Sequence, residues 1–440
     1  MMSLKGLIIV FMTITQSSDG IHSGKEPGCI PPDGCQFQML EGAPTVTCNN
    51  IGLETIPACL PGNYPPRHLL INENNITQIT SIIYDTLEEL YLESNNAIVV
   101  VSEAFRHLSK LKLLSLKYNL IRDIQRHTFI GLTSLEKLYL TGNSMRILPE
   151  QAFYYGYLPL LNILDLSNNS ISDIGDTSFQ YLRNLSKLNL RNNNLASVPL
   201  FENAALDLDD LNLGDNKIEQ VPHDGFKTLT YLKILSLDGN MLTDLPHSAF
   251  WSLKHLNVIH LENNQLRLLW YNLFHVPWET LQEVYLHSNN IDVIHPHLLP
   301  WRQLKVITLE RNPWECTCHA TWMWSIEAVI NNSTSIICKT PTDVHGQNFK
   351  YLNEETLHCP HSAVSIIGIV LGVLLAIGLL IILGYILFRC IRRKQPAHSI
   401  MPKTTTSIYR RMGGKRGNHR NSQQLPVSNQ TIQDASDDEL

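Results

Sequence analysis

The sequence predicts an α/β-type solenoid. We expect a horseshoe of about 11 repeats with a parallel β-sheet on its concave face, followed by one transmembrane helix. Three observations support this prediction. A leucine- and asparagine-containing motif recurs through the middle of the chain, cysteines cluster at both ends of that region, and a long uncharged apolar segment follows the second cluster.

The first apolar segment of the chain is typical of a secretory signal peptide. Residues 1–5 carry one lysine, residues 6–14 form an apolar run, and small and polar residues continue to position 20. This run is too short to cross a bilayer. We therefore expect residues 1–20 to be a signal peptide that exports the chain, rather than a buried strand or helix.

The repeat follows the template L-x-x-L-x-L-x-x-N-x-L, over residues 61–311. Leucines at the fourth and sixth positions point inward from a short strand, and the asparagine turns into the core, where it satisfies backbone groups at the bend. Each repeat buries its leucines only against its neighbours, so stacking stabilises the fold. The asparagines of the eleven copies are spaced by 21 to 26 residues: Asn74, Asn95, Asn119, Asn143, Asn169, Asn193, Asn216, Asn240, Asn264, Asn289 and Asn312.

Phenylalanines on the return segments form a second periodic series. Most of them precede a leucine by three residues: Phe105, Phe129, Phe153, Phe179, Phe226 and Phe250. We predict that these rings stack in the core rather than line a ligand site.

Cysteines flank the repeats in two groups of four. Even groups in an exported chain predict disulfides, and the Cys-x-Cys spacing of the second group is a poor match to a zinc site. An open solenoid needs both ends covered, so we expect caps at residues 29–60 and 312–360. The cysteines are Cys29, Cys35, Cys48 and Cys59 in the first group, and Cys316, Cys318, Cys338 and Cys359 in the second.

Both groups resemble the cysteine-rich caps of extracellular leucine-rich-repeat proteins. The resemblance rests on VTC at 46–48 with LETIP at 53–57, and on NPWECTC at 312–318. It extends over residues 29–360 and implies the same horseshoe fold.

The resemblance also implies disulfide pairings. In the C-terminal cap it implies Cys316–Cys338 and Cys318–Cys359. The N-terminal cap departs from the family, because Phe37 stands where a second cysteine is expected and Cys59 is an additional cysteine. We expect Cys35–Cys48 and Cys29–Cys59 there.

Residues 363–388 contain no charge and are long enough to cross a hydrocarbon core of about 30 Å. The cluster Arg389, Arg392, Arg393 and Lys394 follows directly and marks the cytoplasmic end. We expect a single-pass type I protein of the plasma membrane with an extracellular N-terminus. Residues 389–440 are then a cytoplasmic tail, disordered because large apolar residues are few.

Two features at the membrane suggest further interactions. Gly368 and Gly372 permit close approach of a second helix, although glycine is also tolerated in a membrane helix without a partner. Cys390, beside the basic cluster, is a candidate for palmitoylation.

Charge and motif content exclude several classes of function. The tail holds ten Lys or Arg and four Asp or Glu, so the preceding residues carry a net charge of −12, which argues against nucleic acid as a partner. The chain lacks a Walker loop, a zincin motif and a nucleophile elbow, and its tail is too short for a kinase. We expect neither enzymatic activity nor a cofactor.

Ligand-binding candidates lie on the concave face, at positions that alternate with the inward leucines. Tyr91 and Tyr139 are expected to be exposed aromatics in the N-terminal half, while His260, Glu262, Glu283, Tyr285 and His287 gather on two adjacent strands. Tyrosine gives a large contact area at low entropic cost. The alternatives are a solvated face without a partner and, less favoured, a metal site, for which nothing defines a ligand geometry.

The exported part also carries N-glycosylation sequons, which predict glycans on its surface. Adjacent sequons near the C-terminal cap are not expected to be modified together. The acceptors are Asn75, Asn168, Asn184, Asn331 and Asn332.

The resemblance to neuronal and developmental leucine-rich-repeat membrane proteins implies a cell-surface recognition or adhesion receptor. Its ligand would be an extracellular protein bound on the concave face. Two alternatives remain at this stage: an auxiliary subunit of a membrane channel or receptor, and innate immune recognition through a co-receptor.

Overall fold

The computed structural model describes residues 30–154, 156–201, 206–326, 335–359 and 363–393, in two compact units. The first unit, Met1–Pro360, contains a solenoid, and the second, His361–Leu440, contains a helix. The predicted signal peptide and the tail beyond residue 393 lie outside the described residues.

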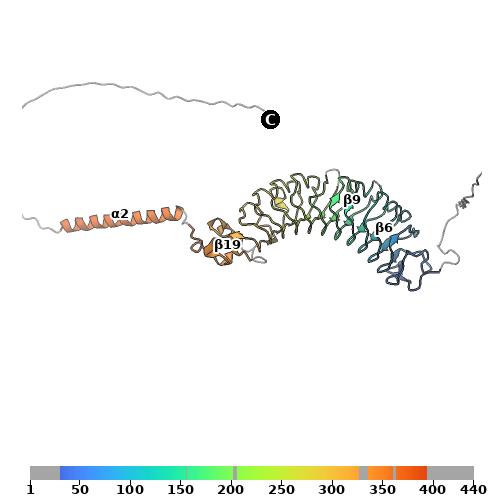
Figure 1. Ribbon diagram of the computed structural model, residues 1–440. Helices are drawn as coiled ribbons and strands as arrows, with labels where there is room; N and C mark the ends of the chain where they lie inside the picture. The colour runs from blue at the N-terminus through green and yellow to red at the C-terminus, as the bar shows by residue number, and fades with distance from the viewer. Residues whose placement is uncertain (1–29, 155, 202–205, 327–334, 360–362, 394–440) are drawn as a thin grey trace, which may run out of the picture. The chain divides into compact units, whose positions relative to one another are not determined.

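One sheet of 13 strands runs along the inner side of the arc that the first unit forms (Figure 1). From β2 onward every neighbouring pair is parallel and pairs without a register shift, while β1 is antiparallel to β2. The strands are, in spatial order, β1 (Gln36–Leu40), β2 (Ala43–Thr47), β3 (His68–Leu70), β5 (Glu89–Tyr91), β7 (Leu113–Ser115), β8 (Lys137–Tyr139), β10 (Ile163–Asp165), β12 (Lys187–Asn189), β13 (Asp210–Asn212), β14 (Ile234–Ser236), β15 (Val258–His260), β16 (Glu283–Tyr285) and β17 (Val306–Thr308).

The strands β3 to β17 of this sheet correspond to the eleven predicted repeats, and β2 adds one turn from the N-terminal cap. The predicted solenoid with a parallel sheet is therefore confirmed. In each three-residue strand from β3 to β17 the middle residue is buried and its neighbours face the concave surface, as in Glu89–Leu90–Tyr91. This alternation follows from the two-residue period of a β-strand.

The return segments consist mainly of turns, and within the described repeats they contain no α-helix. Two short parallel pairs lie on this side, and a third pair lies in the C-terminal cap. The remaining elements are β4 (Gln78–Ile79), β6 (Val99–Val100), β9 (Ile147–Leu148), β11 (Asp173–Ile174), β18 (Trp314–Glu315), β19 (Cys338–Thr340), and the 3-10 helices η1 (Pro277–Glu279), η2 (Cys318–Ile326), η3 (Thr342–Val344) and η4 (Phe349–Tyr351).

The repeat asparagines point into the core, as predicted. Asn240 donates through Nδ2 to the carbonyl oxygens of Leu213 and Leu237 at 3.0 Å, and its Oδ1 accepts from the amide of Ile218 at 3.0 Å. These bonds link one repeat to the one before it. They satisfy backbone groups that would otherwise be buried without partners at the end of each strand.

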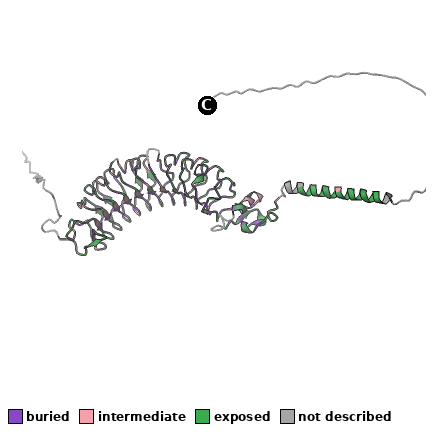
Figure 2. Cartoon of the chain, turned by 180° about the vertical axis from the view of Figure 1, so that it is seen from behind, coloured by how far each residue is buried: buried purple, intermediate pink, exposed green. Residues whose placement is uncertain are grey.

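The phenylalanines stack through the core, and burial continues along the whole arc (Figure 2). The rings of Phe105 and Phe129 lie 6.4 Å apart, and those of Phe250 and Phe274 lie 5.5 Å apart. Two members of the stack, Phe201 and Phe274, are absent from the predicted series. Neither precedes a leucine by three residues, but Phe274 follows its repeat asparagine by ten residues, as the predicted phenylalanines do.

Disulfides hold the C-terminal cap over the last repeat. Cys316 is bonded to Cys338, and Cys318 to Cys359. The indole of Trp314 is 1% exposed and donates to the carbonyl oxygen of Leu309 at 2.9 Å. The cap thus covers the apolar end of the stack, which would otherwise face water.

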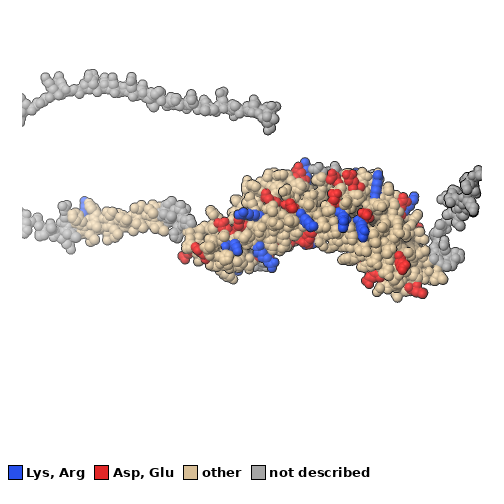
Figure 3. All heavy atoms as spheres, in the orientation of Figure 1, with Lys and Arg blue, Asp and Glu red and all other residues tan. Residues whose placement is uncertain are grey.

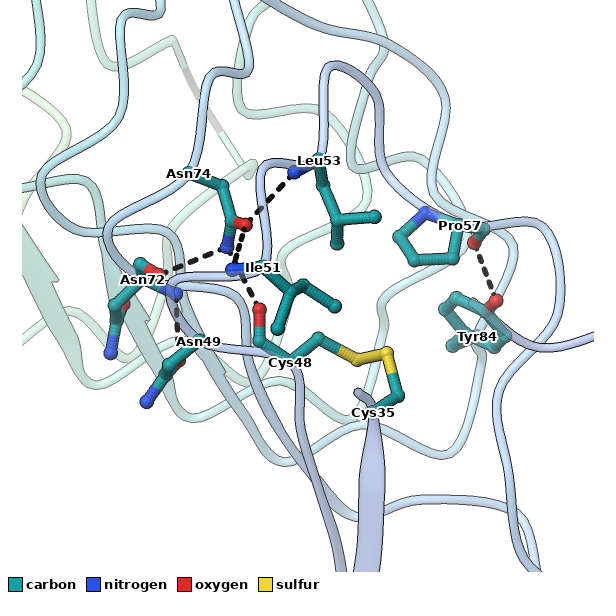
Figure 4. The surroundings of a disulfide bond; sticks show 9 residues. All are labelled: Cys35, Cys48, Asn49, Ile51, Leu53, Pro57, Asn72, Asn74 and Tyr84. Atoms are coloured by element: carbon teal, nitrogen blue, oxygen red, sulfur yellow. Dashed lines mark hydrogen bonds between the residues drawn. A yellow bond between two sulfur atoms is a disulfide. The ribbon is translucent and has the colours of Figure 1, made fainter. Parts of the chain in front are cut away.

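The N-terminal cap is closed by a disulfide between Cys35 and Cys48 (Figure 4). The first repeat asparagine, Asn74, donates to the carbonyl oxygen of Cys48 at 2.8 Å and accepts from the amides of Ile51 and Leu53. The cap therefore joins the same hydrogen-bond ladder as the repeats.

The N-terminal cap departs from the family pattern at two positions, Phe37 and Cys59, which the structure places differently. Phe37, in the place of a cysteine, is partly buried and packs against the core. Cys59 is disulfide-bonded, and its expected partner Cys29 lies outside the described residues.

The second unit contains helix α2 (Ala363–Arg393). Its segment Gly368–Cys390 has a mean hydropathy of 2.9 and is long and apolar enough to cross a membrane. Cys390 is a free, exposed thiol, and Gly368 and Gly372 have open space beside them. The helix therefore fits the predicted membrane span.

Candidate functional site on the concave face

The predicted tyrosines lie on the concave face but are half-buried rather than fully exposed. Tyr91 donates to Glu89 Oε2 at 2.9 Å, and burial, together with this hydrogen bond, raises the pKa of the Tyr91 phenol. The Tyr139 ring lies under the Lys117 ammonium, 4.4 Å from its centroid. Both rings are thus held in place by their neighbours before any ligand arrives.

Between the two tyrosines the face is occupied by polar contacts. Ser115 is fully buried and donates its hydroxyl to the Glu93 carboxylate, and Lys117 lies 3.9 Å from the same carboxylate. This group of Tyr91, Glu93, Lys117 and Tyr139, which we call the N-terminal patch, has both charge signs. Ser115 contributes no accessible surface.

An arginine bridges three repeats in the middle of the face. Arg191 donates to both oxygens of Asp238, at 3.1 and 2.7 Å, and lies 2.6 Å from Asp215. The bridge needs Gly214, because a Cβ there would lie 2.5 Å from Arg191 Nη1 and 2.6 Å from Asp238 Oδ1. Sequence reasoning missed this feature, since the two partners are 47 residues apart.

The structure brings together the candidates predicted in the C-terminal half. His260 Nδ1 and Glu262 Oε1 are 3.1 Å apart, and the His260 and Tyr285 rings are stacked with centroids 4.3 Å apart and 7° between their planes. Tyr285 donates to Glu283 Oε2 at 2.9 Å. His287 lies two residues further along, with Nδ1 3.1 Å from Ser288 Oγ.

A further carboxylate belongs to this group. Glu310 stands one repeat beyond His287, at the equivalent position, and was not among the predicted site residues. The Oε2 atoms of Glu262 and Glu310 are both buried without a hydrogen-bond partner among the described residues. A buried carboxylate oxygen without a donor is unfavourable, so both groups would gain from an added donor. We call His260, Glu262, Glu283, Tyr285, His287 and Glu310 the C-terminal patch.

The carboxylates of this patch change the ionisation of its other groups. The hydrogen bond that the His260 ring donates to Glu262, and the charges of Glu262, Asp238 and Glu283, raise the pKa of His260, against an opposing effect of burial. Burial, followed by the hydrogen bond to Glu283, raises the pKa of Tyr285 to about 12. The tyrosine is therefore neutral at physiological pH, while His260 has an increased protonated fraction.

Replacing His260 with glutamine should reduce stability more at about pH 5.5 than at about pH 8.5. A folded-state pKa above the unfolded value means that protonation stabilises the fold fully below about pH 6.5, and that this contribution is lost as pH rises through the folded-state pKa. We expect the difference in Tm between wild type and His260→Gln to grow by about 2 °C on acidification. Thermal unfolding at both pH values tests this. In a Glu262→Gln background the pH effect should shrink; an unchanged effect would exclude Glu262 as its main cause.

The described sequons are accessible. Asn75, Asn168 and Asn184 are exposed, although Asn168 Oδ1 accepts from Asn192 Nδ2 at 2.7 Å and Asn184 Nδ2 donates to the Pro159 carbonyl at 2.6 Å. Asn331 and Asn332 lie outside the described residues. Between positions 185 and 330 the sequence has no sequon, so no predicted N-glycan originates within the segment that carries the C-terminal patch.

On the lateral face seen in Figure 3, acidic and basic side chains are interspersed. Among the described residues, no group of three or more His, Cys, Asp or Glu side chains is arranged to hold a metal ion. The concave face thus carries two patches that combine aromatic and charged side chains.

Comparison with known proteins matches the repeats directly. The family model described as "Leucine rich repeat" matches residues 85–145, 148–201 and 207–266. Leucine-rich repeat-containing protein 3B of Homo sapiens is 31% identical over 123 residues, which are 28% of this chain and 38% of the relative. Keratocan of Mus musculus is 32% identical over 85 residues, 19% of this chain and 24% of the relative. The chain thus spans less than half the length of these curated relatives.

Two solved structures share the fold. The mouse RP105/MD-1 complex superposes with a TM-score of 0.57 at 24% identity, covering 69% of this chain and 53% of the other. An octameric complex of Latrophilin 3, Unc5D and FLRT2 gives a TM-score of 0.54 at 22% identity, covering 72% and 97%. At these identities the similarity concerns the fold alone.

Proposed function

Since this chain is a leucine-rich-repeat protein, we propose that it is a cell-surface receptor that recognises a protein ligand with the concave face of its solenoid. The observation that carries the proposal is the presence of half-buried tyrosines on that face, each restrained by neighbouring side chains. Rigid aromatic anchors concentrate the energy of protein interfaces, because they lose little entropy on binding.

The concave sheet is well suited to this role for a structural reason. Its strands are in register through the whole arc, so the side chains that face outward form regular columns on a stiff base. A pre-ordered surface avoids the entropic cost of ordering loops on binding. The similar structures support a binding role, since both are named as complexes: RP105 with MD-1, and FLRT2 with Unc5D and Latrophilin 3.

No catalytic activity is assigned to this chain. The matched family model is described as a leucine-rich repeat, and both structural neighbours are named as protein complexes. The functional residues are accordingly those that contact a partner.

We place this receptor in the plasma membrane, with the solenoid outside the cell. In this proposal residues 1–20 are removed, residues 29–60 and 312–360 cap the repeats of 61–311, residues 363–388 span the membrane, and 389–440 lie in the cytoplasm. The apolar helix and the basic residues that follow it support this arrangement.

Alanine at Tyr139 or Tyr285 should weaken partner binding by about 2 kcal/mol, or roughly 30-fold in affinity. The full-length chain displayed on cells would be used to capture extracellular proteins, and captured partners would then be titrated against each variant. Surface display and Tm should remain near wild type, because both rings lie on the surface side of the sheet rather than in the core.

Two controls accompany this experiment. Lys227→Ala, on an exposed turn of the return side, should bind as wild type does. Tyr285→Phe should retain much of the affinity, because it keeps the ring. If both alanine variants bind normally while a glycan engineered on the return side abolishes binding, the concave-face proposal is wrong.

The same capture experiment separates the two alternative roles. Recovery of a channel or receptor subunit that depends on helix α2 rather than on the tyrosines would favour an auxiliary subunit. Recovery of a signalling co-receptor would favour immune recognition.

A further inference from the structure

We propose that the C-terminal patch binds an arginine-bearing basic segment of the protein partner. This inference rests on the proposed function and deepens it, because it assigns a chemistry to the ligand. Four observations carry it: the charge of the patch, its unsatisfied carboxylates, an equivalent contact within the chain itself, and the stacked aromatic pair.

The proportion of basic to acidic side chains on the concave face changes along the arc. From β3 to β12 the outward positions hold both signs of charge: Lys117, Lys137, Lys187 and Arg191 beside Glu89, Glu93 and Asp165. From β14 to β17 those positions hold carboxylates, histidines and neutral residues, without a lysine or arginine. A surface of this composition favours a cationic partner and repels an acidic one.

The basic residues beside these strands lie off their outward positions. Arg311, which is exposed, follows Glu310 in the bend after β17. Lys233 and Lys305 each lie one residue before their strand, at the rim of the sheet. Lys233 forms an ion pair with Asp209 at 2.8 Å, away from the patch, and Lys305 is exposed.

The carboxylates of the patch contact a tyrosine hydroxyl and a histidine ring rather than a lysine or arginine. Glu283 accepts from the Tyr285 hydroxyl, and Glu262 Oε1 contacts the His260 ring. Oε2 of Glu262 and Oε2 of Glu310 have no donor among the described residues. Rotation of either carboxylate toward the surface would expose the unsatisfied oxygen to a donor from a partner.

The chain itself shows which donor satisfies this column of the sheet. Asp238 occupies the same position in its repeat as Glu262 and Glu310 do in theirs. Its two oxygens are both bound by the guanidinium of Arg191. Glu262 lies one repeat and Glu310 three repeats beyond Asp238, and the outward positions from β14 to β17 hold no arginine. A partner's guanidinium would make the equivalent contact there.

The stacked rings of His260 and Tyr285 provide a flat surface for the same group. Along the sheet, the neighbours of this pair in its column are Ser236 and Thr308, each 8% exposed. Because these small residues stand lower than the rings, the outer ring faces are left accessible above them. A planar guanidinium stacks on aromatic faces while its edge donates to carboxylates, a combination that the ammonium group of lysine lacks.

The experiment measures binding of labelled peptides to the full-length chain in phosphatidylcholine nanodiscs by fluorescence anisotropy. The probe is a peptide of alternating serine and arginine, compared with its lysine and citrulline counterparts. We expect the arginine peptide to bind most tightly, and the citrulline peptide, which has the same shape without the charge, to bind at least about tenfold more weakly. The double variant Glu262→Gln, Glu283→Gln should reduce arginine-peptide binding by a similar factor.

A charge-matched control separates the patch from net charge. The double variant Glu219→Gln, Asp224→Asn removes two exposed carboxylates outside the concave strands and should bind the arginine peptide as wild type does. Equal loss in both double variants, or equal binding of the arginine, lysine and citrulline peptides, would overturn the inference.

The outcome is distinguishable from that of the proposed function. If capture of a protein partner depends on Tyr139 and Tyr285 while the carboxylate variants bind the arginine peptide normally, the concave-face receptor stands and the arginine assignment fails. If the arginine peptide binds the patch but capture of a protein partner does not depend on Tyr139 or Tyr285, the arginine assignment stands and the concave-face receptor proposal fails.

Discussion

Replacing Phe250 with alanine should destabilise the solenoid by about 3–5 kcal/mol. The Phe250 ring is fully buried between Phe226, at 6.3 Å, and Phe274, at 5.5 Å. Each neighbouring ring is anchored in its own repeat, so neither can move far enough to fill the space. The cost therefore includes a cavity as well as the lost burial of the ring.

This destabilisation should be concentrated near the substitution, because each repeat contacts mainly its neighbours. Thermal unfolding would report the loss of stability, and hydrogen exchange should show the greatest loss of protection around residues 226–274. Phe250→Leu should recover a large part of the stability. A Phe250→Ala chain that melts within about 1 °C of wild type would show that the phenylalanine stack is dispensable.

The double variant Cys316→Ala, Cys338→Ala should lose about 2–5 kcal/mol and reach the cell surface poorly. The disulfide joins Cys316, directly after β18, to Cys338 at the start of β19, and both cysteines are at most 1% exposed. Without it the cap can separate from the last repeat, whose apolar residues would then contact water. Replacing both cysteines avoids leaving a reactive buried thiol.

The matched control is Cys390→Ala. Cys390 is a free, exposed thiol on helix α2, so its loss should leave folding and surface display unchanged. Surface labelling and thermal unfolding of the purified chain measure both effects. Normal display and unchanged melting of the Cys316→Ala, Cys338→Ala chain would mean that this bridge does not hold the cap in place.

Most of the fold was predictable because the repeat encodes it locally. The asparagine of each copy makes hydrogen bonds to its own and the preceding repeat, and eleven copies repeat the same signal. Parallel register follows from this repetition, since every strand begins at the same template position. The apolar length of residues 363–388 likewise predicted a helix able to cross a membrane.

The phenylalanine series was predicted from its spacing to the following leucine, but its spacing from the repeat asparagine is the more regular one. Counting from the following leucine missed Phe274, whereas counting ten residues from Asn264 finds it. Phe201 is harder to find, because it follows Asn193 by only eight residues. Its ring nevertheless stacks on that of Phe179, with the centroids 6.1 Å apart.

The candidate site depended much more on side-chain packing. The sequence alone placed His260, Glu262 and Tyr285 on adjacent strands, because strand register follows from the repeat. It did not indicate that Tyr91 and Tyr139 are half-buried, since their exposure depends on how Glu89 and Lys117 fold over them.

The sequence by itself determined the solenoid, its caps and an apolar helix, because each arises from a periodic or continuous signal within a short stretch of chain. Only the tertiary structure decided that Arg191 reaches Asp238 across Gly214, while one oxygen each of Glu262 and Glu310 finds no donor within the part of the chain that the structure describes. These contacts join repeats that are distant along the chain, and they depend on side-chain length and on the space left by a missing Cβ. A repeat template specifies the positions that face outward, but not which of their side chains meet.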